Sequence, residues 1–226
     1  MFSIIVPVYN EVSTIDALQN NLFQFLDRAE IIFVDAGSTD GTLDKYRPEF
    51  LLIQSDKKQR AYQMNLGAQA AKGSHLLFLH ADSLLPKGAL EQMESVMDNN
   101  SIGCFGIIFD DTSLLMRICA NISNRRVLKR NIAFGDQGIF LTKESFFELG
   151  MFPEIALMED YQFALNASHA GHVFAFTKDK ITTSARRYGK NPIKQLKLMW
   201  DMRDLRELYV RGVPAEKLLN YYRAIR

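Results

Sequence analysis

The first hundred residues alternate short, β-rich apolar runs with segments of helical periodicity, and this alternation constrains the fold more than any other feature of the chain. The apolar runs cover residues 3–9 (SIIVPVY), 31–35 (IIFVD), 50–53 (FLLI) and 76–80 (LLFLH). Apolar residues recur at helical spacing over residues 15–26, and a second helix is expected over 59–71. Because parallel strands joined by crossover helices have this pattern, we predict an open α/β sheet.

The second half of the chain is mixed. We expect strands at residues 103–109 and 138–142, and helices at about 113–129, 143–150 and 159–171. From Asn191 the chain is predicted to be helical to its end, with breaks at Gly212 and Pro214. A length of 226 residues suffices for one large domain with a substantial core. We therefore predict a main domain over residues 1–190 and a helical C-terminal extension over 191–226.

Charge and hydropathy exclude some partners. The chain has 27 Lys and Arg residues against 26 Asp and Glu residues, so it has no overall attraction to nucleic acid. Its apolar runs are far shorter than the roughly 20 residues that cross a bilayer, and no charged segment of a secretory leader precedes the first strand. We therefore expect a cytoplasmic protein.

The C-terminal tail has a charge bias of its own. Residues 178–226 contain 13 Lys or Arg against 5 Asp or Glu, with Trp200, Tyr209, Tyr221 and Tyr222 among them. Such a tail fits peripheral contact with the inner face of an anionic membrane or with a phosphorylated acceptor. A solvated helical face that packs on the main domain explains it equally well.

The first predicted strand ends in the segment VPVYNE. Pro7 cannot donate a hydrogen bond to a sheet, which suggests that the chain turns out toward a ligand there. Tyr9 is then available to stack on a planar base, and Glu11 to accept a hydrogen bond. The alternative is a proline at a strand end followed by a helix cap.

The second predicted strand ends at Asp35, in the segment VDAGSTDGT. Ligands of open α/β sheets bind at the carboxyl ends of the strands. A carboxylate at this place can accept hydrogen bonds from a ribose or from a base. Asp and Gly after a strand are also common turn residues, so ordinary turn chemistry is the competing interpretation.

The fourth predicted strand runs into His80, Ala81 and Asp82. A divalent cation on a diphosphate needs few protein ligands, since Mg²⁺ keeps part of its hydration shell, and Asp82 is placed to supply one. An imidazole ligand from His80 would favour Mn²⁺. The alternative is the solvated end of a strand.

Two adjacent carboxylates, Glu159 and Asp160, open a predicted helix. A helix N-terminus stabilises anions, so a capping role is one interpretation. The other is a general base that takes a proton from an attacking hydroxyl. Since neighbouring helical residues point about 100° apart, only one of the two faces a given cleft. We assign the base role to Asp160.

The order of these motifs is more specific than any one of them. From Phe2 to about Gly171 the chain resembles the family 2 glycosyltransferases, which have the GT-A fold: a Rossmann-like mixed sheet flanked by helices. Its LHAD segment is similar to that of a smaller subgroup of short, soluble members with a His-Ala-Asp metal motif.

This resemblance implies a nucleotide-diphosphosugar donor such as a UDP- or GDP-sugar, a hydroxyl acceptor, a bound Mn²⁺ or Mg²⁺ ion, and inversion at the anomeric carbon. It also implies roles for individual residues: Pro7, Tyr9 and Glu11 line the nucleoside, Asp35 contacts the base, Arg60 lies near the nucleotide, Asp82 binds the metal with His80 beside it, Gln137 borders donor sugar and acceptor, Asp160 is the base of the Glu159–Asp160 pair, and Arg186 or Arg187 meets the diphosphate.

Two departures from the family pattern keep a second hypothesis open. Ala36 and His80 stand where the family more often has Asp. A catalytically weak sugar-nucleotide-binding or partner subunit with the same fold would tolerate both changes. A nucleotidyltransferase is disfavoured because no Gly-rich triphosphate loop follows the first strand.

Overall fold

Eight strands form one mixed sheet in the computed structural model, which describes residues 1–224. Their order across the sheet is β3-β2-β1-β4-β7-β6-β8-β5. The strands are β1 (Phe2–Val8), β2 (Ala29–Asp35), β3 (Leu51–Gln54), β4 (His75–Phe78), β5 (Ser83–Leu84), β6 (Ile102–Phe109), β7 (Ile139–Thr142) and β8 (Ala175–Thr183). The strands β1 to β4 run parallel, whereas β7 is antiparallel to both β4 and β6. The predicted α/β sheet is confirmed.

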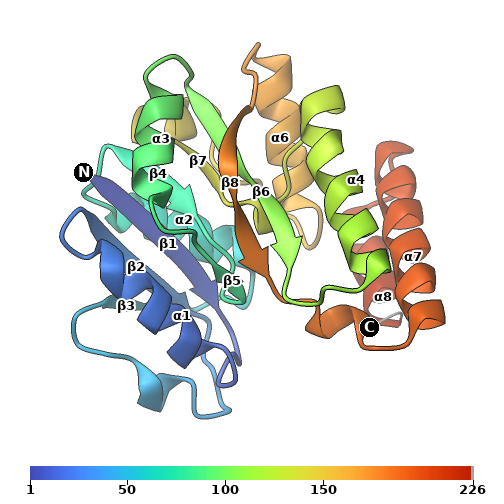
Figure 1. Ribbon diagram of the computed structural model, residues 1–226, viewed down its shortest axis with the longest axis horizontal. Coiled ribbons are helices and arrows are strands. Elements are labelled where there is room, and N and C mark those ends of the chain that lie inside the picture. Colours follow the sequence, from blue (N-terminus) through green and yellow to red (C-terminus); the bar gives the residue numbers. More distant parts are fainter. Residues whose placement is uncertain (225–226) are drawn as a thin grey trace.

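Helices cover both faces of this sheet (Figure 1). They are α1 (Ile15–Leu22), α2 (Arg60–Ala70), α3 (Ala89–Met97), α4 (Leu114–Arg130), α5 (Lys143–Glu148) and α6 (Glu159–His169), with 3₁₀ turns at Phe23–Phe25, Leu43–Lys45, Gly135–Gln137 and Arg186–Tyr188. Helices α1 and α3 pack with one set of buried strand residues, and α2, α5 and α6 pack with another. Alternate residues of β1, such as Ile4 and Ile5, enter opposite cores because successive side chains of a strand point to opposite faces.

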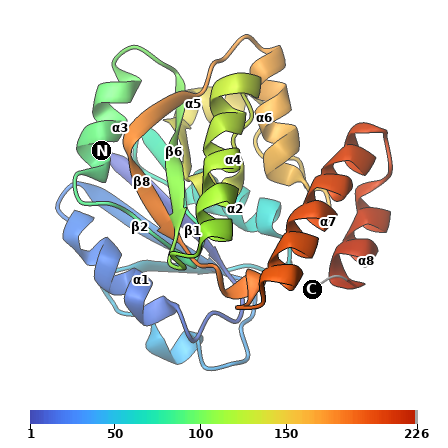
Figure 2. The same cartoon turned by 45° about the vertical axis from the view of Figure 1, so that its right-hand side comes forward.

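The C-terminal extension consists of α7 (Pro192–Val210) and α8 (Ala215–Ala224). Asn191 caps α7: its side-chain oxygen accepts hydrogen bonds from two backbone amides of the first turn. Figure 2 shows α7 lying beside α4, with α8 on the outside. Leu205 and Leu218 of these helices pack against Leu157 and Met158, just before α6. The extension therefore forms a wall of the main body. Within the part of the chain described, no helix is long and apolar enough to cross a bilayer.

Pro7 does not mark a place where the chain leaves the sheet, which corrects the sequence interpretation. Strand β1 continues through Val8, and Pro7 is in register with Val34 of β2. Ile5 accepts a hydrogen bond on the β4 side of the strand, so Pro7, two residues on, faces the same side. The last residue of β4 that pairs with β1 is Phe78, opposite Ile5. The amide that Pro7 lacks would therefore have had no partner in the sheet.

Strand β8 is absent from the sequence-based assignment. It carries three consecutive exposed charged residues at 178–180 and so has no continuous apolar run. Its place in the sheet comes from parallel pairing with β6, about 70 residues earlier in the chain, with a register irregularity between Cys104 and Gly106. Strand β8 ends three residues before Arg186, and it thereby places Arg186 at the site.

Candidate active site

A cavity of about 860 Å³ opens at the carboxyl ends of β1, β4 and β8 and extends between α4 and α7. This volume is in the range of small-molecule sites. Most of the residues singled out in the sequence line it: Pro7, Tyr9, Glu11, Arg60, His80, Asp82, Glu159, Asp160, Arg186 and Arg187. Asp35 and Gln137 are fully buried and do not line it.

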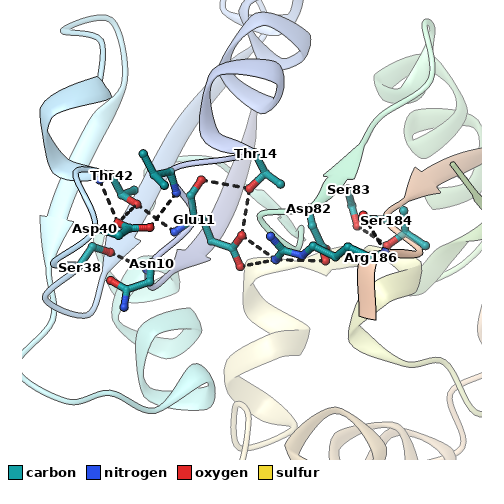
Figure 3. Close-up of polar contacts among 12 residues, drawn as sticks. Asn10, Glu11, Thr14, Ser38, Asp40, Thr42, Asp82, Ser83, Ser184 and Arg186 are labelled. Carbon is teal, nitrogen blue, oxygen red and sulfur yellow. Dashed lines mark hydrogen bonds and ion pairs between the residues drawn. The ribbon is translucent and has the colours of Figure 1, made fainter. Parts of the chain in front are cut away.

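Arg186 connects the ends of two strands at the mouth of the cavity (Figure 3). One of its terminal nitrogens lies 2.6 Å from the Glu11 carboxylate and 3.6 Å from Asp82 Oδ2. Burial raises the pKa of the Asp82 carboxyl, and the charge of Arg186 offsets part of that rise. The guanidinium thus holds together two carboxylates that would otherwise repel each other.

The loops that follow β1 and β2 are tied to each other. The Asn10 amide donates to Ser38 Oγ at 2.9 Å, and the Glu11 amide donates to Thr42 Oγ1, also at 2.9 Å (Figure 3). Asn10 has a φ of 55°, in the left-handed region where Asn is more tolerated than most residues. These bonds hold the backbone amides of Asn10 and Glu11 in place.

Asp35 stabilises the turn after β2. Its Oδ1 accepts hydrogen bonds from the amides of Gly37 and Ser38 at 2.8 Å each, and its Oδ2 accepts one from the Ser38 hydroxyl at 2.7 Å. The phenol of Tyr46 lies 3.4 Å from Oδ2. Both carboxylate oxygens are therefore engaged within the turn. A contact between Asp35 and a base stays a prediction, and it requires one of these bonds to be exchanged.

Arg60, at the start of α2, stands between His80 and Glu159. Its Nε lies 3.1 Å from Glu159 Oε1, and its Nη1 lies 3.4 Å from His80 Nε2. Burial, with a further contribution from the charge of Arg60, lowers the pKa of His80 to about 3, so the imidazole is neutral. Burial also raises the pKa of Glu159 against the opposing effect of Arg60. Glu159 is thus the ionic partner of Arg60.

Asp160, next to Glu159, is held by backbone amides. Its Oδ2 accepts a hydrogen bond from the Gly135 amide at 2.8 Å, and its Oδ1 accepts one from the Tyr161 amide at 2.7 Å. A Cβ atom on Gly135 would lie 2.5 Å from His80 Nε2 and 3.3 Å from Asp160 Oδ2. Only glycine lets the backbone at residue 135 approach both side chains.

No group of three His, Cys, Asp or Glu side chains within residues 1–224 is arranged to hold a metal ion. Asp82 can serve as the single protein ligand of a cation whose other ligands come from phosphate and water. Its side chain lines the cavity and is one quarter exposed (26%). His80 Nε2 is directed at Arg60. These side chains therefore fit a metal ion that is already bound to a diphosphate better than a metal ion alone.

Two cavity residues were missed in the sequence. Asp136 lines the cavity beside the buried Gln137, and its Oδ1 has no hydrogen-bond partner among the described residues. Burial raises the pKa of Asp136 to about 6. Arg126 of α4 also lines the cavity, and it donates to Gln137 Oε1 at 2.9 Å. The segment GDQG was singled out for Gln137, whereas its neighbour Asp136 lines the cavity. Nothing in the sequence near Arg126 indicated that residue.

The glycosyl transferase family 2 model matches residues 3–150 of the chain. A PGL/p-HBAD biosynthesis glycosyltransferase of Mycobacterium bovis is 41% identical over 93 residues, a match that covers 38% of this chain and 36% of that protein. The chain thus spans only about a third of the length of this relative.

Solved structures share the fold. The mannosyltransferase PcManGT of Pyrobaculum calidifontis, in complex with GDP-Man and Mn²⁺, aligns with a TM-score of 0.69 and 20% identity over 99% of this chain and 69% of that chain. S. aureus TarS 1–349, in complex with UDP-GlcNAc, aligns with a TM-score of 0.64 and 22% identity over 82% of this chain and 58% of that chain. These likenesses show a GT-A fold.

Proposed function

The chain belongs to glycosyl transferase family 2, and on that premise we propose that it moves a sugar from a nucleotide-diphosphosugar to a hydroxyl acceptor, with inversion at the anomeric carbon. One observation carries the proposal. A single cavity brings together Asp82 with the cations Arg60 and Arg186, which suit a diphosphate, and a second carboxylate, Asp160, which suits a base. The sugar then lies between the two groups.

The donor nucleoside is assigned to the end of the cavity beside β1. Tyr9 is 41% exposed and presents its ring there, with Lys58 Nζ 4.6 Å from the ring centroid. A planar base can stack on such a ring, and Glu11, which lines the same cavity, can accept a hydrogen bond from a ribose hydroxyl or a base. Structural relatives bind UDP-GlcNAc and GDP-Man, which supports a UDP- or GDP-sugar as the donor.

The diphosphate is assigned to Asp82, Arg186 and Arg60. Asp82 would hold a Mn²⁺ or Mg²⁺ ion on the diphosphate, and the ion would neutralise the charge that develops on the leaving group. The structural relative PcManGT was solved with Mn²⁺. Arg186, the exposed partner of Glu11 and Asp82, is placed to donate to phosphate oxygens. Arg60 adds a second cation that lines the same cavity.

Asp160 is assigned as the general base. It accepts the proton of the acceptor hydroxyl while the hydroxyl oxygen forms a bond to the anomeric carbon and the bond from that carbon to the diphosphate breaks. The displacement inverts the anomeric configuration because attack and departure take place on opposite faces. Two backbone amides hold the carboxylate in place and leave the remaining lone pairs for the substrate.

Nucleotide binding and donor turnover, measured together, test the proposal. We expect UDP or GDP with Mn²⁺ or Mg²⁺ to raise the melting temperature, chelator to abolish the rise, and a matching nucleotide sugar to release nucleoside diphosphate. Asp82→Asn should lose the metal-dependent part of the rise, whereas Asp98→Asn, an exposed carboxylate on the far end of α3, should keep it.

The same experiment separates the alternative. A metal-dependent rise in melting temperature with no release of nucleoside diphosphate from any donor would indicate the weak sugar-nucleotide-binding subunit and contradict the proposed transfer. No rise with any combination of nucleotide and metal would contradict donor binding itself.

A further inference from the structure

The part of the cavity that lies away from β1 has an apolar wall. Helices α4 and α7 lie side by side there, and four of their large apolar side chains line the cavity while 41 to 54% exposed: Ile118, Ile122, Leu196 and Trp200. Side chains of this size are normally buried by packing. Here all four line the cavity that Asp160 also lines, so they form an open apolar groove.

Two arginines stand at the inner end of this groove. The guanidinium carbons of Arg126 and Arg206 lie 3.5 and 5.5 Å from the centroid of the Phe134 ring. Neither forms an ion pair within residues 1–224. Arg126 donates only to neutral oxygens, the carbonyl of Ile132 at 3.3 Å and the amide of Gln137 at 2.9 Å.

These cations remain charged despite their surroundings. Burial lowers the pKa of Arg126 to about 10, which still leaves it protonated near neutral pH. Burial lowers the pKa of Arg206 too. The carboxylate of Asp136 offsets part of the effect of burial on both arginines, although it forms an ion pair with neither. Two partly desolvated guanidinium groups that share one such carboxylate still favour the binding of a further anion. Guanidinium groups bind phosphate and carboxylate through paired hydrogen bonds.

From this arrangement we propose that the groove is the acceptor subsite, and that the acceptor is an amphiphilic anion. Its phosphate or carboxylate group binds to Arg126 and Arg206, and its apolar body lies between α4 and α7. The assignment of this ligand as the acceptor rests on the proposed function. The chemical class of the ligand rests only on the residues of the groove. A hydroxyl close to the anionic group would then face Asp160, because Gly135, which donates to Asp160, follows Phe134 directly. A concave groove inside one cavity fits a small molecule better than the flat face of a partner protein.

Trp200 makes the proposal measurable because it is the only tryptophan of the chain. Its emission reports on occupancy of the groove. The probes are monomeric octyl phosphate, octyl glucoside as the neutral match with the same chain, and inorganic phosphate as the match without a chain. We expect octyl phosphate to give a saturable blue shift and to bind about tenfold more tightly than octyl glucoside, as hydrogen bonds to charged groups allow. Inorganic phosphate should give no shift.

Variants assign the two parts of the subsite. Arg206→Gln should weaken octyl phosphate about tenfold and leave octyl glucoside unchanged, whereas Ile122→Ser, at an exposed position that folding tolerates, should weaken both. Val173→Ser, at an even more exposed apolar residue outside the cavity, should change neither. Melting temperatures without ligand check that each variant folds.

Three results would overturn the proposal: equal affinity for octyl phosphate and octyl glucoside, an Arg206→Gln variant that keeps wild-type affinity for octyl phosphate, or a Trp200 response to phosphatidylglycerol vesicles but not to monomeric octyl phosphate. The last would identify a membrane-docking face instead. Because no nucleotide is present, failure here leaves donor binding and turnover to their own test.

Discussion

The two ends of the cavity are built differently. At the β1 end, which we call the donor half, carboxylates, hydroxyls and backbone amides already pair with one another, as in the bonds of Glu11 to Thr42 and Arg186. At the α4–α7 end, the acceptor half, Ile122 and Trp200 stay exposed, and Arg126 and Arg206 form no ion pair within the described chain. In the donor half, the polar groups are bonded to one another within the protein. In the acceptor half, apolar and cationic groups remain available to a ligand.

This contrast separates what the fold supplies from what a ligand supplies. A preformed donor half reduces the entropy that a nucleotide sugar loses on binding. An acceptor half with unsatisfied apolar and cationic groups gains most of its stabilisation from the ligand. Substitutions in the donor half should therefore lower stability and nucleotide binding together, whereas those in the acceptor half should change ligand binding with little effect on stability.

The largest effect is expected at Gly135, where the two halves meet. Gly135→Ala places a Cβ atom against His80 and Asp160 and displaces one or both. Misplaced reacting groups commonly cost on the order of 100-fold in turnover, and we expect a loss of about 10- to 100-fold in kcat. Nucleotide binding, measured by thermal shift, should change little.

Gly171→Ala is the control for this substitution. Gly171 has a φ of 87° and open space around it, so alanine there strains the backbone by about 1 kcal/mol without touching the cavity. It should lower the melting temperature and leave kcat unchanged. If both variants lost turnover equally, the contact of residue 135 with His80 and Asp160 would have no special role.

The next effect depends on pH and concerns Asp136. Because its pKa is raised to about 6 in the folded protein, its stabilising contribution is complete below the unfolded pKa near 4 and is lost as the pH rises through 6. Asp136→Asn should therefore stabilise the protein at pH 8 by on the order of 2 kcal/mol and by much less at pH 4. Urea denaturation at the two pH values measures the difference. The same gain at both would show that Asp136 does not titrate in this range.

A smaller effect is expected in the donor half at Thr42, which is fully buried. Thr42→Val removes the acceptor of the Glu11 amide and should lower the free energy of unfolding by about 1 to 2 kcal/mol while weakening nucleotide binding. Thr39→Val, at an exposed neighbour whose hydroxyl forms no hydrogen bond with residues 1–224, is the matched control. Equal stability of the two variants would contradict a preformed donor half.

The smallest effect on stability is expected at Ile122 in the acceptor half. Since its side chain is 54% exposed, Ile122→Ser should change the free energy of unfolding by no more than about 0.5 kcal/mol. The comparison with Thr42→Val is direct, because one substitution breaks a contact that the fold has made and the other removes a contact that a ligand would make. A loss above about 2 kcal/mol at Ile122 would mean that the groove is part of the core.

The edge of the sheet that carries the donor half could be predicted from the sequence because its signals are local. Strand patterns ending in Tyr9, His80 and Asp82 placed these residues on one edge of a parallel sheet, and the structure brings them to one cavity. Asp35 also has a structural role for a local reason: Gly37 and Ser38 turn their amides back onto its carboxylate. A hydrogen bond inside a turn and one to a ligand require the same residue types, so the pattern could not separate them.

The acceptor half was not predicted because its residues meet only through tertiary packing. Arg126 and Arg206 are 80 residues apart and converge on Phe134, which belongs to a third segment. The excess of Lys and Arg in the tail was noted, yet a solvated face and a ligand site give the same composition. Strand β8, whose middle is charged, was missed as well, since its pairing with β6 rather than its own pattern makes it a strand.

The central claim, that Asp160 is the base of a glycosyl transfer, is tested most directly by Asp160→Asn, which keeps the size of the side chain and one acceptor oxygen. Turnover and nucleotide binding are measured on the same sample, with Asp98→Asn as the control. We predict a loss of at least about 100-fold in the release of nucleoside diphosphate, the usual scale for general-base catalysis, with metal-dependent nucleotide binding unchanged. Wild-type turnover by Asp160→Asn would contradict the account.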